Sequence, residues 1–381
     1  MKPLSKKICF NPWNFMEIQD DLSVSSCGPN WTRAYTYGAI DGNLDVEAIW
    51  NGERAKDFRR SMIDGSFEFC DQTLCPMIQN GSLPDRKAVR AGTFGPAAKA
   101  IIDGHRLTSA SPKFINLAFD RSCNLRCPSC RESRYFLNEQ VDSLQFQRKR
   151  ALLEHVLEHA YEAKARTTIN VTGSGDPFAS VLFRDFITRM DGARNPNLHL
   201  QLQTNGVLFT PENWSTLDKM HGNPISAIIS LDAGTEETYA VTRRGGDWAR
   251  LMKNLEFVDE LYQKRQLTWV RLDFVCQHLN YREMPLFVEI AKRHKFFCYF
   301  SRILEWKNGA YQGPVFLEHD VSNPLHHEHR HFLKVVNQYF GYDRIDFGNL
   351  SEFRTPLRIL IGGLHAMYKR CLPGSDWFTN A

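Results

Sequence analysis

The sequence has no long apolar run and no long run of one charge. No apolar stretch reaches the roughly 20 residues that a membrane-spanning helix needs, and Met1–Lys7 lacks the apolar core of a signal peptide. The formal net charge is only +4 over 381 residues, and the basic residues are not clustered. These absences predict a cytoplasmic protein that binds neither membrane nor nucleic acid.

Internal repeats and low-complexity segments are also missing. A chain of 381 residues has room for a large core and about two domains. Ten cysteines in a cytoplasmic protein favour metal ligands or buried thiols over disulfides. They comprise Cys123, Cys127 and Cys130 close together, Cys9, Cys27, Cys70 and Cys75 before them, and Cys276, Cys298 and Cys371 singly after them.

The three close cysteines are spaced C-x3-C-x2-C, directly after an apolar run. Three thiolates on one loop can hold three corners of a [4Fe–4S] cluster and leave the fourth iron open to an outside ligand. A zinc site is the alternative, but it needs a fourth Cys or His. Residues 131–140 contain neither, so zinc would require a ligand from farther along the chain.

The segment from Cys123 to Cys130 resembles the signature of the radical S-adenosylmethionine (SAM) enzymes. The resemblance implies that the open iron binds SAM through its amino and carboxylate groups. Reductive cleavage then gives a 5′-deoxyadenosyl radical that abstracts hydrogen from a substrate, with the electron supplied by a flavodoxin- or ferredoxin-type partner. One position departs from the pattern, because Ser129 stands where the family usually has an aromatic residue. Tyr135 and Phe136 are the candidate replacements.

From about residue 112, apolar runs alternate with helix-like stretches. The predicted strands are 114–119, 167–172, 197–203, 226–231, 268–276 and 297–304, and the predicted helices are about 138–160, 180–191, 211–220, 247–264 and 284–295. Six such units predict an α/β fold, a partial (β/α)6 TIM-like barrel with its chemistry at the carboxyl ends of the strands.

Short motifs at those strand ends resemble the SAM contacts of the family. The residues that the resemblance implies as cofactor-binding are Gly173, Ser174, Gly175, Asp176, Pro177, Asn205, Ser230, Asp232, Arg243 and Arg302. Residues 172–178 also fit an ordinary loop. Asp232 also fits a cap for a helix beginning near Thr235, and Arg243 also fits a solvated ion pair.

The N-terminal segment combines Cys9-x17-Cys27, Trp50, Gly65 and Cys70-x4-Cys75. This layout resembles the SPASM domain of radical SAM enzymes, although that domain normally follows the barrel and often has seven cysteines. The resemblance implies a second, auxiliary [4Fe–4S] cluster held by all four cysteines. Full ligation favours electron transfer, since no iron is left open. A structural zinc site with four cysteine ligands remains the alternative.

These patterns divide the chain into four parts. We expect a SPASM-like domain over 1–85, a linker over 86–111, the partial barrel over 112–310, and a C-terminal helical extension over 311–381 that packs on the barrel.

A closed auxiliary cluster suits removal of an electron from a substrate radical. The sequence therefore predicts a radical SAM oxidoreductase that acts on a peptide or protein side chain, or on a sugar-type small molecule. The alternative is a redox-neutral epimerase in which a cysteine thiol, with Cys276 as first candidate, returns hydrogen to the substrate. A further alternative is a non-enzymatic iron–sulfur or zinc module.

Overall fold

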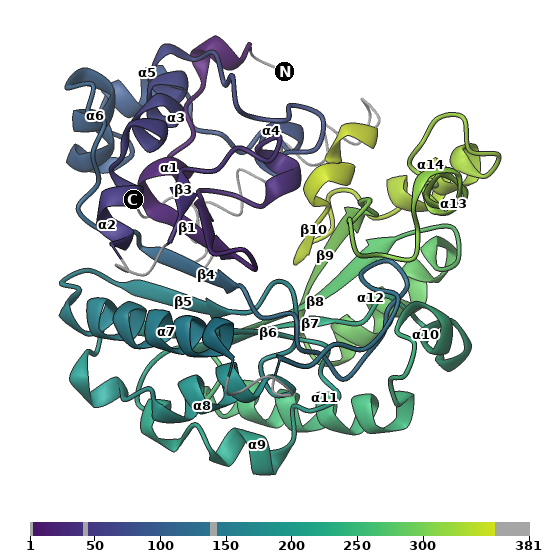
Figure 1. Ribbon diagram of the computed structural model, residues 1–381. Helices are drawn as coiled ribbons and strands as arrows, with labels where there is room; N and C mark the ends of the chain where they lie inside the picture. Colours follow the sequence, from purple (N-terminus) through teal and green to yellow (C-terminus); the bar gives the residue numbers. More distant parts are fainter. Residues whose placement is uncertain (1–2, 41–44, 138–142, 355–381) are drawn as a thin grey trace.

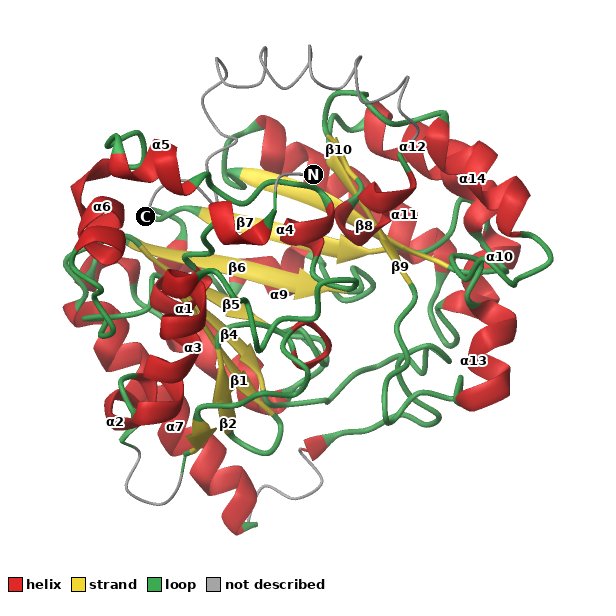
Figure 2. Cartoon of the chain, turned by 90° about the horizontal axis from the view of Figure 1, so that it is seen from above, coloured by secondary structure: helices red, strands yellow, loops and turns green. Residues whose placement is uncertain are grey.

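The computed structural model describes residues 3–40, 45–137 and 143–354. Its strands form one ten-stranded sheet in the order β10-β9-β8-β7-β6-β5-β4-β1-β2-β3. The strands from β4 to β9 are parallel and follow one another in chain order. The sheet is curved (Figures 1 and 2), and its parallel strands confirm the predicted partial barrel.

The six barrel strands coincide with the six predicted runs. They are β4 (Phe114–Ala118), β5 (Thr167–Val171), β6 (Leu198–Thr204), β7 (Ile225–Ser230), β8 (Trp269–Cys276) and β9 (Phe297–Arg302). Their mostly apolar composition fits parallel strands, which are covered on both faces.

The helices between these strands lie along the outer face of the sheet (Figure 1). They are α7 (Leu144–Glu162), α8 (Val181–Arg189), α9 (Pro211–Ser215), α10 (Glu236–Thr242), α11 (Trp248–Gln263) and α12 (Met284–Arg293). Most begin at a side-chain cap: Ser143, Ser180 and Asp247 accept backbone N–H groups at the starts of α7, α8 and α11. The predicted start of the first helix, 138–142, lies outside the described residues.

Strand β8 shows how the two faces of the sheet differ. Its buried positions alternate, and Leu272, Phe274 and Cys276 share the face that packs on α12. The Phe274 ring contacts Phe287 of that helix at 4.9 Å between ring centroids. Arg271 and its ion-pair partner Asp273 occupy the opposite, interior face.

The N-terminal segment adds strands to the same sheet. Strand β1 (Phe15–Gln19) pairs in parallel with β4, and β2 (Ser23–Ser25) and β3 (Gly38–Ala39) continue the sheet outward in antiparallel pairing. The Asn116 amide of β4 donates to the Glu17 carboxylate of β1 at 3.0 Å. The predicted boundary at residue 85 is therefore crossed by a continuous sheet.

Further N-terminal helices lie on the inner side of the sheet, above it in Figure 1. They are α1 (Asn11–Asn14), α2 (Val46–Trp50), α3 (Glu53–Asp64), α4 (Pro76–Gln79), α5 (Arg86–Arg90) and α6 (Gly95–Asp103). The last two occupy the range predicted as a linker. Helix α4 contacts the 3₁₀ helix Gly348–Phe353, which follows β10 (Ile345–Asp346) beyond the far barrel edge. The N-terminal segment thus reaches both edges of the six-stranded barrel (Figure 2).

One buried arginine holds this small segment together. The Arg59 guanidinium, fully excluded from solvent, donates to the carbonyls of Pro12, Trp50 and Leu107 and to the Asn51 side chain, at 2.8–3.0 Å. Burial lowers its pKa to about 10, which still leaves it charged at neutral pH. A buried cation with four acceptors ties together loops that lie far apart in the sequence.

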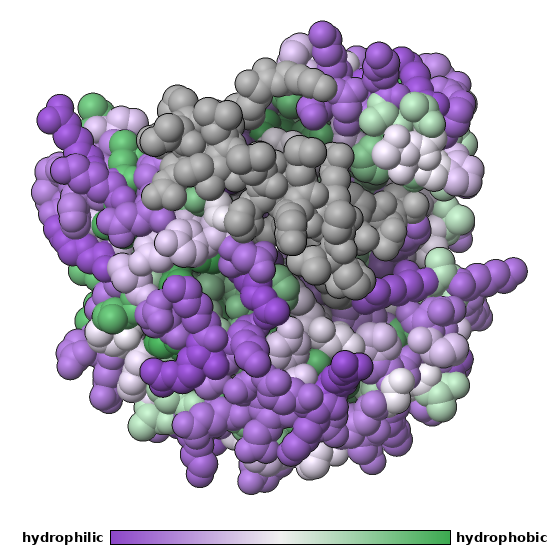
Figure 3. Space-filling view, turned by 180° about the vertical axis from the view of Figure 1, so that it is seen from behind, coloured by the Kyte–Doolittle hydropathy of each residue, from purple (hydrophilic) through white to green (hydrophobic). Residues whose placement is uncertain are grey.

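The C-terminal part contributes α13 (Gly313–His319) and α14 (His329–Asn337) beside the barrel (Figure 1). Residues 355–381 of the predicted extension lie outside the described residues. The face in Figure 3 is mostly hydrophilic, with hydrophobic residues scattered among the polar ones. No helix within residues 3–40, 45–137 and 143–354 has both the length and the apolarity to cross a bilayer.

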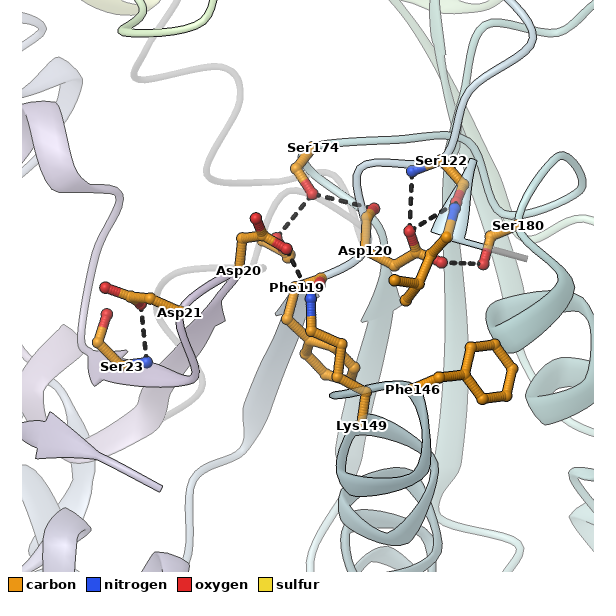
Figure 4. Close-up of polar contacts among 12 residues, drawn as sticks. Asp20, Asp21, Ser23, Phe119, Asp120, Ser122, Phe146, Lys149, Ser174 and Ser180 are labelled. Carbon is orange, nitrogen blue, oxygen red and sulfur yellow. Dashed lines mark hydrogen bonds and ion pairs between the residues drawn. The ribbon is translucent and has the colours of Figure 1, made fainter. Parts of the chain in front are cut away.

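Lys149 of α7 connects the N-terminal segment to the barrel (Figure 4). Its side chain is 1% exposed, and its ammonium group contacts the Asp20 carboxylate after β1 at 2.6 Å and the Phe119 carbonyl after β4 at 2.5 Å. The same cation therefore fixes the ends of two neighbouring strands.

Replacing Lys149 with Met keeps the length of the stem and removes the charge. We expect Lys149→Met to lower the free energy of unfolding by about 1–3 kcal/mol, because the buried carbonyl loses its donor. Urea denaturation followed by circular dichroism measures this. Lys264→Met, which removes an exposed pair with Glu260, is the matched control and should change stability little. Equal effects of the two substitutions would contradict the role of Lys149.

Candidate active site

The three-cysteine loop follows β4 at the carboxyl end of the barrel. Cys123 and Cys127 are each 6% exposed, Cys130 is half-buried, and the three surround the fully buried Leu125. The Cys123 N–H donates to the Tyr135 carbonyl at 3.0 Å, which closes the loop at its base. Burial is the largest influence on Cys123 and raises the pKa of its thiol to about 12.

Asp120 fixes the start of this loop (Figure 4). Its carboxylate accepts the Ser122 N–H and hydroxyl at 2.8 and 2.7 Å, and also the Ser180 hydroxyl, which caps α8. The Ser174 hydroxyl donates to the carbonyls of Ala118 and Asp120 at 2.6 and 3.2 Å. Two strand ends and one helix start are thereby joined behind the cysteines.

Each cysteine sulfur of the loop receives an N–H donor. The Asn205 amide lies 3.7 Å from Cys123 Sγ, and the Leu125 N–H lies 3.4 Å from the same sulfur. The Arg243 guanidinium lies 3.8 Å from Cys127 Sγ. The third donor is the Arg131 guanidinium, 3.4 Å from Cys130 Sγ. Such donors stabilise thiolate over thiol and set the reduction potential of an iron–sulfur cluster.

Arg131 is a residue that the sequence interpretation missed. It is 4% exposed, and its guanidinium also donates to the Ser174 and Arg121 carbonyls at 2.6 and 2.5 Å. It therefore joins the cysteine loop to the glycine-rich loop after β5. Its position directly after Cys130 was the only signal in the sequence.

The glycine-rich loop approaches the cysteine loop closely. A Cβ on Gly175 would lie 2.5 Å from the Ser122 carbonyl oxygen and 2.6 Å from that of Asp120, so only glycine fits there. Gly173 is exposed, Ser174 and Gly175 are half-buried, and Pro177 is buried. The backbone at 173–175 is the accessible part of this loop.

Asp176 is buried beneath the glycine-rich loop, unlike the accessible backbone at 173–175. It is fully buried, and its carboxylate accepts the Thr204 hydroxyl and the Asn205 N–H at 2.7 and 2.9 Å, and the Phe178 N–H at 3.1 Å. Burial raises its pKa, although these donors oppose the shift. Asp176 thus positions Asn205, whose amide contacts Cys123.

Asp232 and Arg243 form a buried ion pair beside the cysteines. The Arg243 guanidinium contacts the Asp232 carboxylate at 2.8 Å, and the Val275 N–H donates to the same carboxylate at 2.7 Å. Burial raises the Asp232 pKa, and Arg243 opposes this shift. Asp232 does not cap α10, because the N-cap there is Thr235. Ser230 ends β7 and is half-buried nearby in sequence.

Two predicted site residues lie elsewhere. Cys276 is on the helix-facing side of β8, 1% exposed, and its thiol contacts the Met284 sulfur of α12 at 4.0 Å. This places it on the face opposite the barrel interior, and its role as a hydrogen donor stays a prediction. Arg302 at the end of β9 bonds through its N–H to the Asn349 side chain at 3.0 Å and pairs with Glu352. It lines a cavity of about 230 Å³ with Asn30, Leu74, Ile303, Leu304, Glu305, Phe316 and Asp320, on the side of the N-terminal cysteines.

The four N-terminal cysteines gather in one region, where Cys70 is buried and Cys9, Cys27 and Cys75 are half-buried. Burial is the main reason that their thiol pKa values are raised, and the cysteines raise one another's values further: Cys9 is affected by Cys70 and Cys75, and Cys27 by Cys9. The Asn11 amide donates to Cys27 Sγ at 3.4 Å. Thiols gathered in this way need a cationic metal centre to be held as thiolates.

This region faces the open side of the barrel. Cys27 interacts electrostatically with Glu17 of β1, and Cys75 with Tyr299 of β9. Strand β1 lies next to β4 at one edge of the six barrel strands, and β9 is the barrel strand at the opposite edge. The nine cysteines in the described part of the chain are free thiols, so no disulfide joins Cys9 to Cys27 or Cys70 to Cys75.

The chemistry of the two cysteine sets fits [4Fe–4S] clusters. Among the described residues, no three Cys, His, Asp or Glu side chains lie close enough to share a single metal ion. The thiolates of a [4Fe–4S] cluster bind different iron atoms and so lie farther apart than ligands of one zinc. Cys123, Cys127 and Cys130 would hold one cluster, and Cys9, Cys27, Cys70 and Cys75 the other.

Comparison with known proteins agrees with both sites. Residues 118–276 match the radical SAM superfamily, and residues 9–76 match SPASM, an iron–sulfur cluster-binding domain. The chain therefore contains a radical SAM domain preceded by a SPASM domain, and these two matches indicate [4Fe–4S] clusters and SAM as its cofactors. No curated protein sequence matches the chain.

Solved structures that match part of the chain include SuiB of Streptococcus suis and anSMEcpe with bound AdoMet. SuiB is 14% identical with a TM-score of 0.42, and the match covers 66% of this chain and 51% of SuiB. The anSMEcpe structure is 18% identical with a TM-score of 0.38, and the match covers 60% of this chain and 59% of anSMEcpe. The chain thus spans between half and three-fifths of the length of these proteins.

Iron content distinguishes clusters from zinc. We expect about eight irons and eight sulfides per reconstituted chain, corresponding to two four-iron clusters. Cys27→Ala and Cys127→Ala should each lower the iron count by about four, because each removes a ligand of a different set. Metal analysis by mass spectrometry, with sulfide determination, measures this. About four irons with one zinc in the unsubstituted protein would instead assign zinc to the N-terminal cysteines.

Arg131 can be tested through the reduction potential. We expect Arg131→Met to make the midpoint potential of the three-cysteine cluster more negative, because a cation and an N–H donor beside Cys130 are lost. Arg131→Lys should restore part of the shift by keeping the charge. Redox titration followed by electron paramagnetic resonance measures both. Arg121→Met, at a half-buried arginine that stacks over Tyr135, is the control, and an equal shift there would contradict a specific role for Arg131.

Proposed function

We propose that the chain is a radical SAM oxidoreductase that removes two hydrogen atoms from a peptide or protein side chain, or from a sugar-type small molecule. One leaves as a hydrogen atom taken by the 5′-deoxyadenosyl radical, and the other leaves as an electron to the auxiliary cluster and a proton to solvent. The observation that carries this proposal is the N-terminal site of four converging cysteines. With four protein ligands, no iron of a cluster there is left open, which suits it to accept an electron. Bound SAM and the open iron together supply a 5′-deoxyadenosyl radical, which abstracts hydrogen from the substrate.

The residues at the barrel mouth would hold SAM. The backbone of Gly173, Ser174 and Gly175 is accessible and approaches the cysteine loop, so its polar groups suit the amino group of SAM. Asn205 and the Asp232–Arg243 pair lie beside the cysteine sulfurs. In the proposal, Arg243 is shared between Asp232 and the SAM carboxylate, and Ser230 and Asp232 reach the ribose hydroxyls.

The placement of the four-cysteine site supports oxidation. It lies against β1 and β9, and so over the open side of the barrel. A substrate held between the two cysteine sets would have the radical source on one side and an electron acceptor on the other. Peptide substrates are in keeping with the solved structures of SuiB bound to the precursor peptide SuiA and of anSMEcpe bound to the Cp18Cys peptide.

The two single cysteines within the described residues, Cys276 and Cys298, do not favour the epimerase alternative. Cys276 packs on α12, and Cys298, 3% exposed, occupies a buried position of β9. The third single cysteine, Cys371, lies outside the described residues.

SAM cleavage and product mass together test the proposal. With dithionite, the reconstituted protein should release 5′-deoxyadenosine, and Cys123→Ala should abolish this. Incubation with a cell extract, followed by mass spectrometry, should yield a product lighter by about 2 Da, from loss of two hydrogens. Cys27→Ala should retain SAM cleavage and lose this product, because it lacks the electron acceptor.

The control for this experiment is Cys276→Ala, which should still form the oxidised product. Running the reaction in D₂O identifies the contrary outcome. A product that gains one solvent deuterium, without losing two hydrogens, would show epimerisation and overturn the oxidase proposal.

A further inference from the structure

A groove lies over the outer surface of the three-cysteine loop. Its volume is about 380 Å³, and Arg126, Glu132, Ser133, Arg134 and Gly245 line it. Arg126 stands between two cysteines of the loop, and its N–H donates to the Arg244 carbonyl at 3.0 Å. The groove therefore joins the cysteine loop to the segment that follows α10.

The groove carries an excess of exposed positive charge. Arg126, Arg134 and Arg244 are exposed, and within the described part of the chain none has a carboxylate within ion-pair distance. Among the lining residues, two cations, Arg126 and Arg134, face one carboxylate, Glu132, and Arg244 directly precedes the lining Gly245. Unpaired guanidinium groups gathered on one surface attract an anionic partner and accelerate its association.

The arginines at the groove differ from the two arginines that contact the cysteine sulfurs. Arg131 and Arg243 are directed to the cysteine sulfurs, and Arg243 is already paired with Asp232. Arg134 instead lies across the groove over Gly245, where a Cβ would come within 3.0 Å of its guanidinium nitrogen. The absence of a side chain at Gly245 leaves this surface open.

The groove also lies where an electron has to enter. Cys127 is 6% exposed and Cys130 is half-buried, so the loop is close to the surface at this point. SAM cleavage consumes one electron for each SAM molecule. That electron comes from a separate low-potential carrier, which is oxidised by one electron as the cluster is reduced by one.

We propose that Arg126, Arg134 and Arg244 form the docking surface for an acidic one-electron carrier protein of the flavodoxin or ferredoxin class. The proposal rests on the proposed function, since it presupposes a redox-active cluster at Cys123, Cys127 and Cys130. The three arginines pair with carboxylates that surround the exposed edge of the carrier's flavin or cluster, and so hold that edge against the cysteine loop. An acidic segment of a peptide substrate is the competing occupant.

The test compares a protein reductant with a chemical one. The reconstituted double variant Arg126→Glu/Arg134→Glu is assayed for 5′-deoxyadenosine release, with a purified flavodoxin reduced by its NADPH-dependent reductase, and separately with dithionite. We expect the KM for flavodoxin to rise about tenfold or more. The dithionite-driven rate should stay within about twofold. The unsubstituted protein should lose flavodoxin-driven rate as NaCl is raised from about 50 to about 300 mM, and the variant should lose much less.

Arg150→Glu/Arg330→Glu is the matched control, since it reverses two exposed arginines on α7 and α14, away from the groove. It should leave the KM for flavodoxin unchanged. An unchanged KM in the groove variant would overturn the proposal. An equal loss with dithionite would also overturn it, by showing that the arginines act on the cluster or on substrate binding. Failure of the unsubstituted protein to cleave SAM with dithionite would instead refute the proposed function itself.

Discussion

The parallel pairing of β1 with β4 is the contact on which the rest of the structure depends. It runs from Phe15 opposite Phe114 to Gln19 opposite Ala118, and the Glu17–Asn116 hydrogen bond lies at its centre. Through this pairing the four-cysteine segment becomes an extension of the strand that leads into the three-cysteine loop. Lys149 then fixes the ends of both strands from outside. The two cysteine sets thus share one rigid support and do not depend on a flexible linker for their relative position.

The barrel strands and the cysteine sets were predictable from the sequence, because both depend on local patterns. The six barrel strands are apolar runs between helix-like stretches, and the cysteine spacing defines a ligand set without knowledge of the fold. The pairing of β1 with β4 was not predictable in this way, since it joins residues 99 positions apart. The predicted linker became two helices for a similar reason: α5 and α6 contact each other, and that packing is tertiary.

In the candidate site too, contacts that follow from local motifs were predictable, and contacts that depend on tertiary packing were not. Asn205 lies beside Cys123 and Arg243 beside Cys127, whereas Cys276 lies on the helix-facing side of β8 and not at the barrel interior. Its alternation with Leu272 and Phe274 already placed it on the helix side. Arg131 was overlooked because one arginine has no pattern, and its contact with Ser174 depends on loop packing. The SAM contacts stay predictions, as do the domain boundaries.

The order of the two domains has a consequence for how the protein is made. The ribosome completes Cys9, Cys27, Cys70, Cys75 and β1 before it reaches β4, the neighbour that β1 needs on its barrel side. During that interval the four thiols are present while the sheet that supports them is unfinished. Delivery of iron and sulfide to the first site can therefore precede closure of the barrel. In the reverse domain order, the barrel would already be complete when the auxiliary cysteines emerged.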